Sequence, residues 1–334
     1  MPDLGLFVAA ALALSLNLYA VLGGADYGGG MWTLLAFGPR ATRQRDIVAR
    51  ALAPVWEANH VWLVLAIVIL FTGFPAAFAA LGTALHVPLT LLLFGIVLRG
   101  AAFVFRAYGG SGGRPARLWE HPFAAASAVT PLVIGMVVGA VTEGHIRVAH
   151  GKVQAGPFYA WTTPFCWLVG VFAMSLFAFL AAVYLTIEAD STELADDFRR
   201  RALTAGVAVA CLALAVFWAS NAEVRNGLTR SFWAPLLHVA TGACASAAFA
   251  FLYTRAFRWA RVAAAAQVSC IVWGWVLAQY PFLIRPDITV QNTVAPAATL
   301  RPLVILLAAG ALVLFPALAY LFSVFDPAPA RRDT

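Results

Sequence analysis

Long apolar runs constrain the fold of this chain more than any other feature of its sequence. Nine runs follow one another along the 334 residues, each close to or above the ~20 residues that a helix needs to cross about 30 Å of hydrocarbon. Alternating segments typical of membrane β-strands are not seen. We predict an all-α polytopic membrane protein, a single integral membrane domain over residues 1–334, with helices at about 4–23, 51–74, 82–106, 121–142, 161–188, 202–220, 237–256, 263–279 and 302–325.

Composition supports this prediction, because 62% of the residues are hydrophobic and only 11% are charged, whereas a soluble domain has about 25% charged residues. The first run, from Leu4 to about Leu22, is longer than the usual apolar core of a signal peptide, and no basic segment precedes it. We interpret this run as the first membrane span.

Basic residues are divided unevenly among the connections. Most lie in the first, third, fifth and seventh connections and in the C-terminal tail, from Arg40, Arg43, Arg45 and Arg50 to Arg331 and Arg332. Short loops rich in Arg and Lys stay in the cytoplasm, so we expect a multi-pass protein with its N-terminus outside and its C-terminus in the cytoplasm. The net charge of +7 then needs no nucleic-acid partner, because the arginines are spread over five connections rather than gathered in one stripe.

Cysteine and histidine spacing gives no pattern of a metal or heme site. The four cysteines lie inside apolar runs without a CxxC pair, which disfavours disulfides, zinc and iron–sulfur clusters. The histidines in or next to the runs do not form a pair repeated at fixed spacing on two helices; they are His60, His86, His121 and His238. We therefore expect no metal and no heme bound by ligands of this chain.

Polar residues inside the apolar runs are the candidates for function. The stretch "APVWEANHVWLVLAIVIL" carries Glu57, Asn59 and His60, although an ionised side chain at mid-depth costs roughly 2.5 to 3.5 kcal/mol on insertion scales. If this helix begins near residue 51, Glu57 lies about 9 Å along it, and His60 follows one turn later on the same face. Asp26 and Arg99, on the two neighbouring predicted helices, fall at a comparable depth.

Three explanations of these charges stay open at this point. A carboxylate in such a place suits a proton relay, a structural ion pair or a bound cation. Arg99 either offsets Glu57 or Asp26, or extends to the interface alone. Trp56 beside Glu57 either packs against other side chains or stacks on a quinone ring.

Glycines surround Asp26 in "GGADYGGGMW". No GxxxxGK[ST] pattern is present, which disfavours a nucleotide loop. We expect close helix approach there, together with a break after the first span.

Four segments, in order, resemble the signature segments of subunit II of cytochrome bd-type quinol oxidases, nearer to the cyanide-insensitive branch. They are "GGADYGGGMW", "APVWEANHVWLVLAIVILFTGFPAAFAAL", "VLRGAAFVFRAYG" and "QYPFLIRPDITVQNTVAPAATL". The resemblance implies two four-helix bundles plus one peripheral helix. It also implies a partner, subunit I, which carries hemes b and d and the quinol-oxidising loop, whereas subunit II carries no heme.

Such a complex oxidises quinol at the outer side of the bacterial cytoplasmic membrane and reduces O₂ to water with cytoplasmic protons, so that charge is separated without a pump. The resemblance implies a proton route through Asp26 and Glu57 and a structural quinone beside Trp56. It does not decide whether a small single-helix accessory subunit joins the complex. Departures bear on that route: the family often has acids where this chain has Gly23 and Val104. His60 is then a candidate for a rerouted path, because histidine side chains exchange protons near neutral pH.

Two other classes of function compete with this reading. A stand-alone proton or ion transporter would use the same intramembrane carboxylates, but such folds commonly show helix breaks in both halves, and we expect a break only after the first span. In a purely structural assembly subunit, Asp26, Glu57 and His60 would be locked in place, with Arg99 as ion-pair partner and Asn59 as hydrogen-bond partner.

Overall fold

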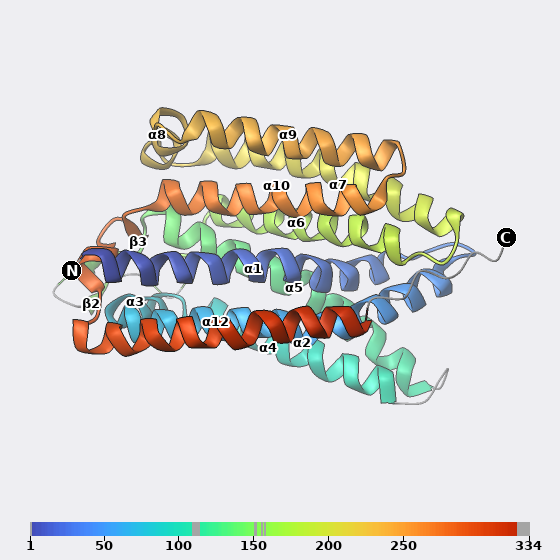
Figure 1. Ribbon diagram of the computed structural model, residues 1–334, viewed down its shortest axis with the longest axis horizontal. Helices are drawn as coiled ribbons and strands as arrows, with labels where there is room; N and C mark the ends of the chain where they lie inside the picture. The colour runs from blue at the N-terminus through green and yellow to red at the C-terminus, as the bar shows by residue number, and fades with distance from the viewer. Residues whose placement is uncertain (1, 109–113, 150–151, 155, 157, 326–334) are drawn as a thin grey trace.

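The computed structural model describes residues 2–108, 114–149, 152–154, 156 and 158–325, with side chains described outside 2–3, 52–58, 106–108, 114–117 and 321–325. It consists of helices with two short hairpins (Figure 1). The helices are α1 (Pro2–Leu34), α2 (Ala41–Gly73), α3 (Pro75–Ala84), α4 (His86–Tyr108), α5 (Arg114–Glu143), α6 (Pro164–Glu188), α7 (Thr192–Ala219), α8 (Ala222–Arg230), α9 (Ala234–Tyr253), α10 (Phe257–Gln279), α11 (Val290–Thr293) and α12 (Ala297–Phe325).

Two groups of four long helices make up the molecule. The first contains α1, α2, α4 and α5, and the second contains α6, α7, α9 and α10. Helix α12 packs on α1 and α2 at the edge of the first group (Figure 1). Helix α6 packs on both α1 and α5 and so joins the two groups. The expected all-α architecture is confirmed.

Among the described residues, eight helices are long and apolar enough to cross a membrane, and a bent pair formed by α2 and α3 brings the total to as many as nine. The pair bends by 116° at the fully buried Phe74, and Pro75 occupies the first turn of α3. The helix predicted at 82–106 instead begins at His86, and residues 82–84 belong to α3. Sequence hydropathy placed the bend correctly but missed the start of α4, because apolar residues continue from α3 through Leu85 into α4.

The break expected after residue 23 is wrong, since α1 continues to Leu34 through all of the glycines. An unbroken helix keeps its backbone groups hydrogen-bonded inside hydrocarbon. The expected close approach is present. A Cβ at Gly28 would lie 2.1 Å from the backbone oxygen of Phe177 on α6, and one at Gly30 would lie 2.1 Å from Oγ of Ser127 on α5.

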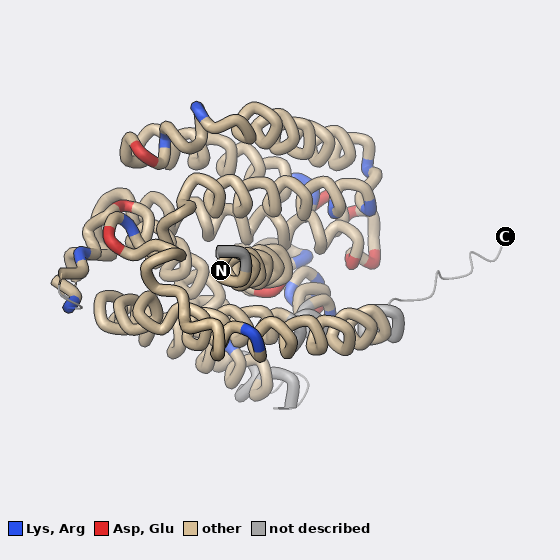
Figure 2. Tube along the Cα trace, turned by 60° about the vertical axis from the view of Figure 1, so that its left-hand side comes forward, with Lys and Arg blue, Asp and Glu red and all other residues tan. Residues whose placement is uncertain are grey.

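Helix α2 begins at Ala41 rather than near residue 51, because its polar first turns have partners on α7. The Arg40 guanidinium donates to both carboxylate oxygens of Asp197, at 2.8 and 2.7 Å. Gln44 also donates to Asp197 and accepts from Arg201. Figure 2 shows charged residues mainly near helix ends, with long uncharged stretches between them.

The opposite end of the molecule carries two antiparallel hairpins, β1 (Val148–Ala149) with β2 (Lys152–Val153) and β3 (Phe282–Ile284) with β4 (Ile288–Thr289). The segment that joins β3 to β4 contains Arg285, whose side chain is 5% exposed. It donates to the backbone oxygen of Ala278, to Gln279 and to Glu223. The loop is thereby fixed to the end of α10 and to α8.

Candidate functional site

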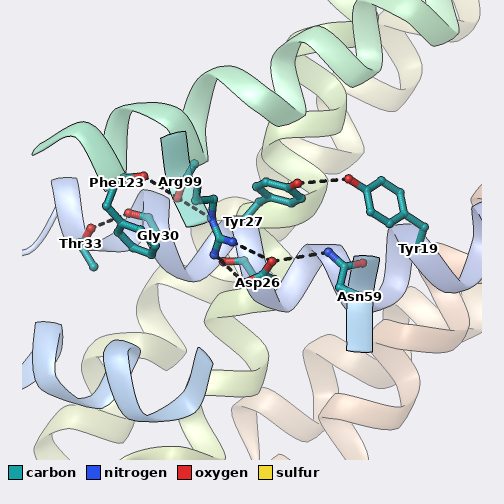
Figure 3. A network of polar contacts seen from close by, with 9 residues as sticks. Tyr19, Asp26, Tyr27, Gly30, Thr33, Asn59, Arg99 and Phe123 are labelled. Carbon is teal, nitrogen blue, oxygen red and sulfur yellow. Dashed lines mark hydrogen bonds and ion pairs between the residues drawn. The ribbon is translucent and has the colours of Figure 1, made fainter. Parts of the chain in front are cut away.

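A buried ion pair between α1 and α4 forms the centre of the candidate site (Figure 3). The Asp26 side chain is 0% exposed and that of Arg99 is 1% exposed. Arg99 Nη1 donates to Asp26 Oδ2 at 2.9 Å, and Nη2 donates to both Oδ1 and the backbone oxygen of Asp26. This two-pronged geometry matches the planar guanidinium to the planar carboxylate.

The remaining surroundings of the Arg99 guanidinium are aromatic and hydroxyl groups. Its carbon lies 4.8 Å from the ring centre of Tyr27 and 5.0 Å from that of Phe123, positions at which an aromatic face attracts a cation. Nε donates to Ser127 Oγ at 3.0 Å, and this hydroxyl donates to the backbone oxygen of Phe123. Arg99 therefore stays inside the bundle and does not extend to the interface.

Asn59, on α2, is the third polar side chain at this level. It is 0% exposed, and its amide nitrogen lies 3.5 Å from Asp26 Oδ2. A carboxylate that accepts from Arg99 offers only acceptor atoms, so the NH₂ group of the amide must face it. Its Oδ1 then points away and has no hydrogen-bond partner among the described residues.

Two tyrosines extend the polar cluster along α1. The hydroxyls of Tyr19 and Tyr27, which are 4% and 0% exposed, lie 3.2 Å apart (Figure 3). Sequence reasoning missed this pair because tyrosine in an apolar run reads as ordinary packing. The available signal was the spacing of Tyr19, Gly23 and Tyr27, since residues four apart share a helix face.

The structure describes the side chains of some predicted site residues but not of others. It brings Asp26, Asn59 and Arg99 together and pairs Arg99 with Asp26. His60 is partly buried on the turn that carries Asn59. Trp56 and Glu57 belong to the same helix, but their side chains lie outside the described residues.

Val104, the position at which the resemblance leads us to expect an acid, is 41% exposed on α4. This position therefore does not belong to the buried cluster around Asp26.

The histidines do not fit a heme site within the described part of the chain. His86, His121 and His238 are exposed, and His145 lies beside Glu143. No group of three or more His, Cys, Asp or Glu side chains with metal-binding geometry occurs among the described residues. The arrangement is suited to holding charge and protons in a protein interior.

Comparison with known families decides the membership of the chain. The family model "Cytochrome bd terminal oxidase subunit II" matches residues 4–325. The chain belongs to this family. As a cytochrome bd subunit II, it is a component of a membrane-embedded quinol oxidase complex of the bacterial inner membrane, which contains hemes and a subunit I.

Relatives of this subunit II match over most of their length. It is 24% identical over 324 residues to the "Putative cytochrome bd menaquinol oxidase subunit II" of Bacillus subtilis (strain 168), covering 92% of this chain and 91% of that protein. It is 27% identical over 320 residues to the "Cytochrome bd-I ubiquinol oxidase subunit 2" of Escherichia coli (strain K12), covering 82% and 79%.

The fold also matches that of a chain of known structure. A chain of the bd oxidase from Geobacillus thermodenitrificans superposes with a TM-score of 0.82 and 22% identity, covering 97% of this chain and 99% of that chain. This likeness supports the two-bundle fold of subunit II described above.

Proposed function

We propose that this subunit II supports the heme-bearing subunit I and gives cytoplasmic protons access to the buried polar cluster through Glu57, His60 and Asp26. The single observation that carries the proposal is the contact of Asn59 with Asp26. It connects the turn of α2 that bears Glu57 and His60 with a carboxylate that is closed off from solvent.

The fixed charges favour this role. Asp26 and Arg99 neutralise each other, so the cluster holds ionised groups in a low dielectric without a net charge that would repel an incoming proton. Glu57 and His60 lie one turn apart on the α2 backbone, and a carboxylate beside an imidazole can exchange protons near neutral pH.

The direction of the proposed path follows from the basic residues. The arginine-rich end, where Arg40 binds α7 and Arg201 binds the backbone oxygen of Leu35 just after α1, faces the cytoplasm under the positive-inside rule. The N-terminus is then outside and the C-terminus cytoplasmic. Water formation consumes cytoplasmic protons while quinol oxidation releases protons outside, so the oxidase separates charge without pumping.

Hemes b and d, held by subunit I, supply the electron transfer to O₂ when bound. The role of this chain is to position subunit I and to hold protons at named side chains. Trp56 remains the proposed contact of a structural quinone, and a single-helix accessory subunit is a further proposed partner.

A Glu57→Gln variant tests the proton role. The glutamine keeps the shape of the side chain but cannot carry a proton as a carboxylate does, so we expect slower O₂ reduction by a complex with normal heme content. The matched control is Glu193→Gln, which removes a carboxylate that is 73% exposed at the start of α7. Loss of the heme-loaded complex in the Glu57 variant would indicate a structural role, and unchanged turnover would remove Glu57 from the path.

A stand-alone transporter is the alternative function. It predicts a colourless chain that purifies without partners, whereas the oxidase predicts heme absorption bands and a second multi-span subunit in the purified sample.

A further inference from the structure

Two of the four cysteines meet across the seam between α9 and α10, in the second group of helices. Cys244 lies near the middle of α9 and Cys270 near the middle of α10. Their thiols interact as hydrogen-bonding partners, and both side chains are partly buried. Neither residue has a role in the proton path proposed above.

The packing of the two helices accounts for this contact. Helices α9 and α10 run antiparallel beside each other (Figure 1). An added Cβ at Gly274 of α10 would lie 2.8 Å from Cδ2 of Leu237 of α9, which fixes the register of the pair. Cys270 lies one turn before Gly274, while Thr241 and Cys244 lie one and two turns after Leu237. In an antiparallel pair, these positions face each other.

The Thr241 hydroxyl is the other polar group beside Cys270. It donates to the backbone oxygen of Leu237 at 2.7 Å, and it also interacts with the Cys270 thiol as a hydrogen-bonding partner. A hydroxyl at this place can turn its hydrogen toward a thiolate, which is the reactive form of cysteine. Cys270 is therefore the thiol of the pair that is better placed to react first.

The chemistry available to two thiols in contact is limited. Structural zinc sites and iron–sulfur clusters take four ligands, and no group of three or more His, Cys, Asp or Glu side chains with metal-binding geometry occurs in the part of the chain that the structure describes. A disulfide needs only two thiols whose sulfur atoms can come into bonding contact. The pair therefore fits oxidation better than metal binding.

We propose that Cys244 and Cys270 form an oxidisable thiol pair, which hydrogen peroxide converts to a disulfide between α9 and α10. The Cys270 thiolate attacks one peroxide oxygen and becomes a sulfenic acid, while the O–O bond breaks and the second oxygen leaves as water with the thiol proton. The Cys244 sulfur then attacks the sulfenic sulfur, and the hydroxyl leaves as a second water with the Cys244 proton. The two sulfurs lose two electrons in total, and the two peroxide oxygens accept them.

Hydrogen peroxide suits the place of this pair in the fold. Both thiols lie within apolar membrane spans, which a small uncharged oxidant can enter and an ionic one cannot. Partial reduction of O₂ gives hydrogen peroxide, so an oxygen-reducing complex works beside its precursor. The disulfide would fasten α9 to α10, which itself packs on α1 and α6.

The test uses the purified, assembled oxidase treated with hydrogen peroxide, after which the remaining thiols are blocked under denaturing conditions. Trypsin separates the two cysteines, because Arg255, Arg258 and Arg261 lie between them in the sequence. We expect mass spectrometry to detect the tryptic peptide that contains Cys244 joined to the one that contains Cys270. Dithiothreitol should separate the two peptides.

Three serine variants give the controls. Cys244→Ser and Cys270→Ser should each abolish the linked peptide, whereas Cys211→Ser, at an exposed position on α7, should retain it. A complex without the linked peptide after peroxide treatment overturns the proposal, even if copper phenanthroline joins the two thiols. A peroxide-dependent link to Cys211, or between two copies of the chain, overturns it as well.

Discussion

Arg99 of α4 holds both carboxylate oxygens of Asp26 of α1 across 73 positions of sequence, and neither side chain is more than 1% exposed. The pair fixes α4 to α1 at the level where the glycines of α1 meet α5 and α6. It therefore acts on packing as well as on charge.

Removing one partner of this pair should be more harmful than removing both. Asp26→Asn leaves an uncompensated buried guanidinium, a change that costs about 3 to 5 kcal/mol in other proteins. We expect a lower yield of heme-loaded complex and a lower melting temperature in detergent. Asp26→Leu combined with Arg99→Leu should recover part of the loss. A double variant as unstable as the single one would show that the pair is needed for more than charge balance.

Gly28 should not tolerate a side chain. A Cβ there would lie 2.1 Å from the Phe177 backbone oxygen, and overpacking of this kind costs typically 1 to 3 kcal/mol. We expect Gly28→Ala to lower the melting temperature of the complex. Gly82→Ala on α3 is the matched control, because its Cβ meets nothing within 4 Å. Equal melting temperatures for the two variants would contradict the close approach of α1 and α6.

The polar contacts at the arginine-rich end should depend on one carboxylate. Asp197 is 17% exposed and accepts from Arg40 and Gln44, and hydrogen bonds to charged groups contribute about 1.5 to 3 kcal/mol each. Asp197→Asn should therefore destabilise the subunit measurably in thermal unfolding. Asp190→Asn removes a carboxylate that is 43% exposed, and we expect a change below about 1 kcal/mol.

Arg285 should be the main support of the loop between β3 and β4. Burial lowers the pKa of Arg285 from its usual value, and Glu223 partly opposes this shift. Arg285→Ala removes three hydrogen bonds, so we expect faster cleavage of this loop by protease added to the purified complex. Arg43→Ala, at a position that is 56% exposed at the other end of the molecule, should leave the cleavage rate unchanged. A protected loop in the Arg285 variant would assign the support to other contacts.

The orientation can be tested by thiol labelling of intact cells. A cysteine introduced at Lys152, which is exposed in β2, should react with a membrane-impermeant reagent added outside. A cysteine at Arg43, which is 56% exposed near the start of α2, should react only after permeabilisation. The reverse pattern would invert the proposed topology.

Sequence reasoning predicted the helical membrane fold because hydropathy depends on composition over a span. It failed where neighbouring helices decide the outcome. Glycines 28 and 30 predicted a break, yet the helix continues because α5 and α6 fill the space beside them. The early start of α2 was missed for a similar reason, since its partner Asp197 lies on a distant helix.

In the candidate site, too, some features could be predicted from the sequence and others depend on neighbouring helices. The depth of Asp26 and Arg99 could be predicted from rise per residue, and the structure selects their pairing from the alternatives. The Tyr19 and Tyr27 contact, and the lack of a partner for Asn59 Oδ1 among the residues that the structure describes, depend on side-chain directions. Hydropathy carries no information on these directions.

The seam between α1 and α6 restricts how the subunit can move. Gly28 brings the two helices so close that the backbone of one touches the other, and Trp32 donates to the Ala178 backbone oxygen at 2.9 Å further along the seam. Rocking of one bundle against the other would have to separate these contacts. We therefore expect the proposed proton transfer to proceed by small rotations of side chains, while the helices stay fixed. This subunit would then differ from carriers that alternate between two open conformations.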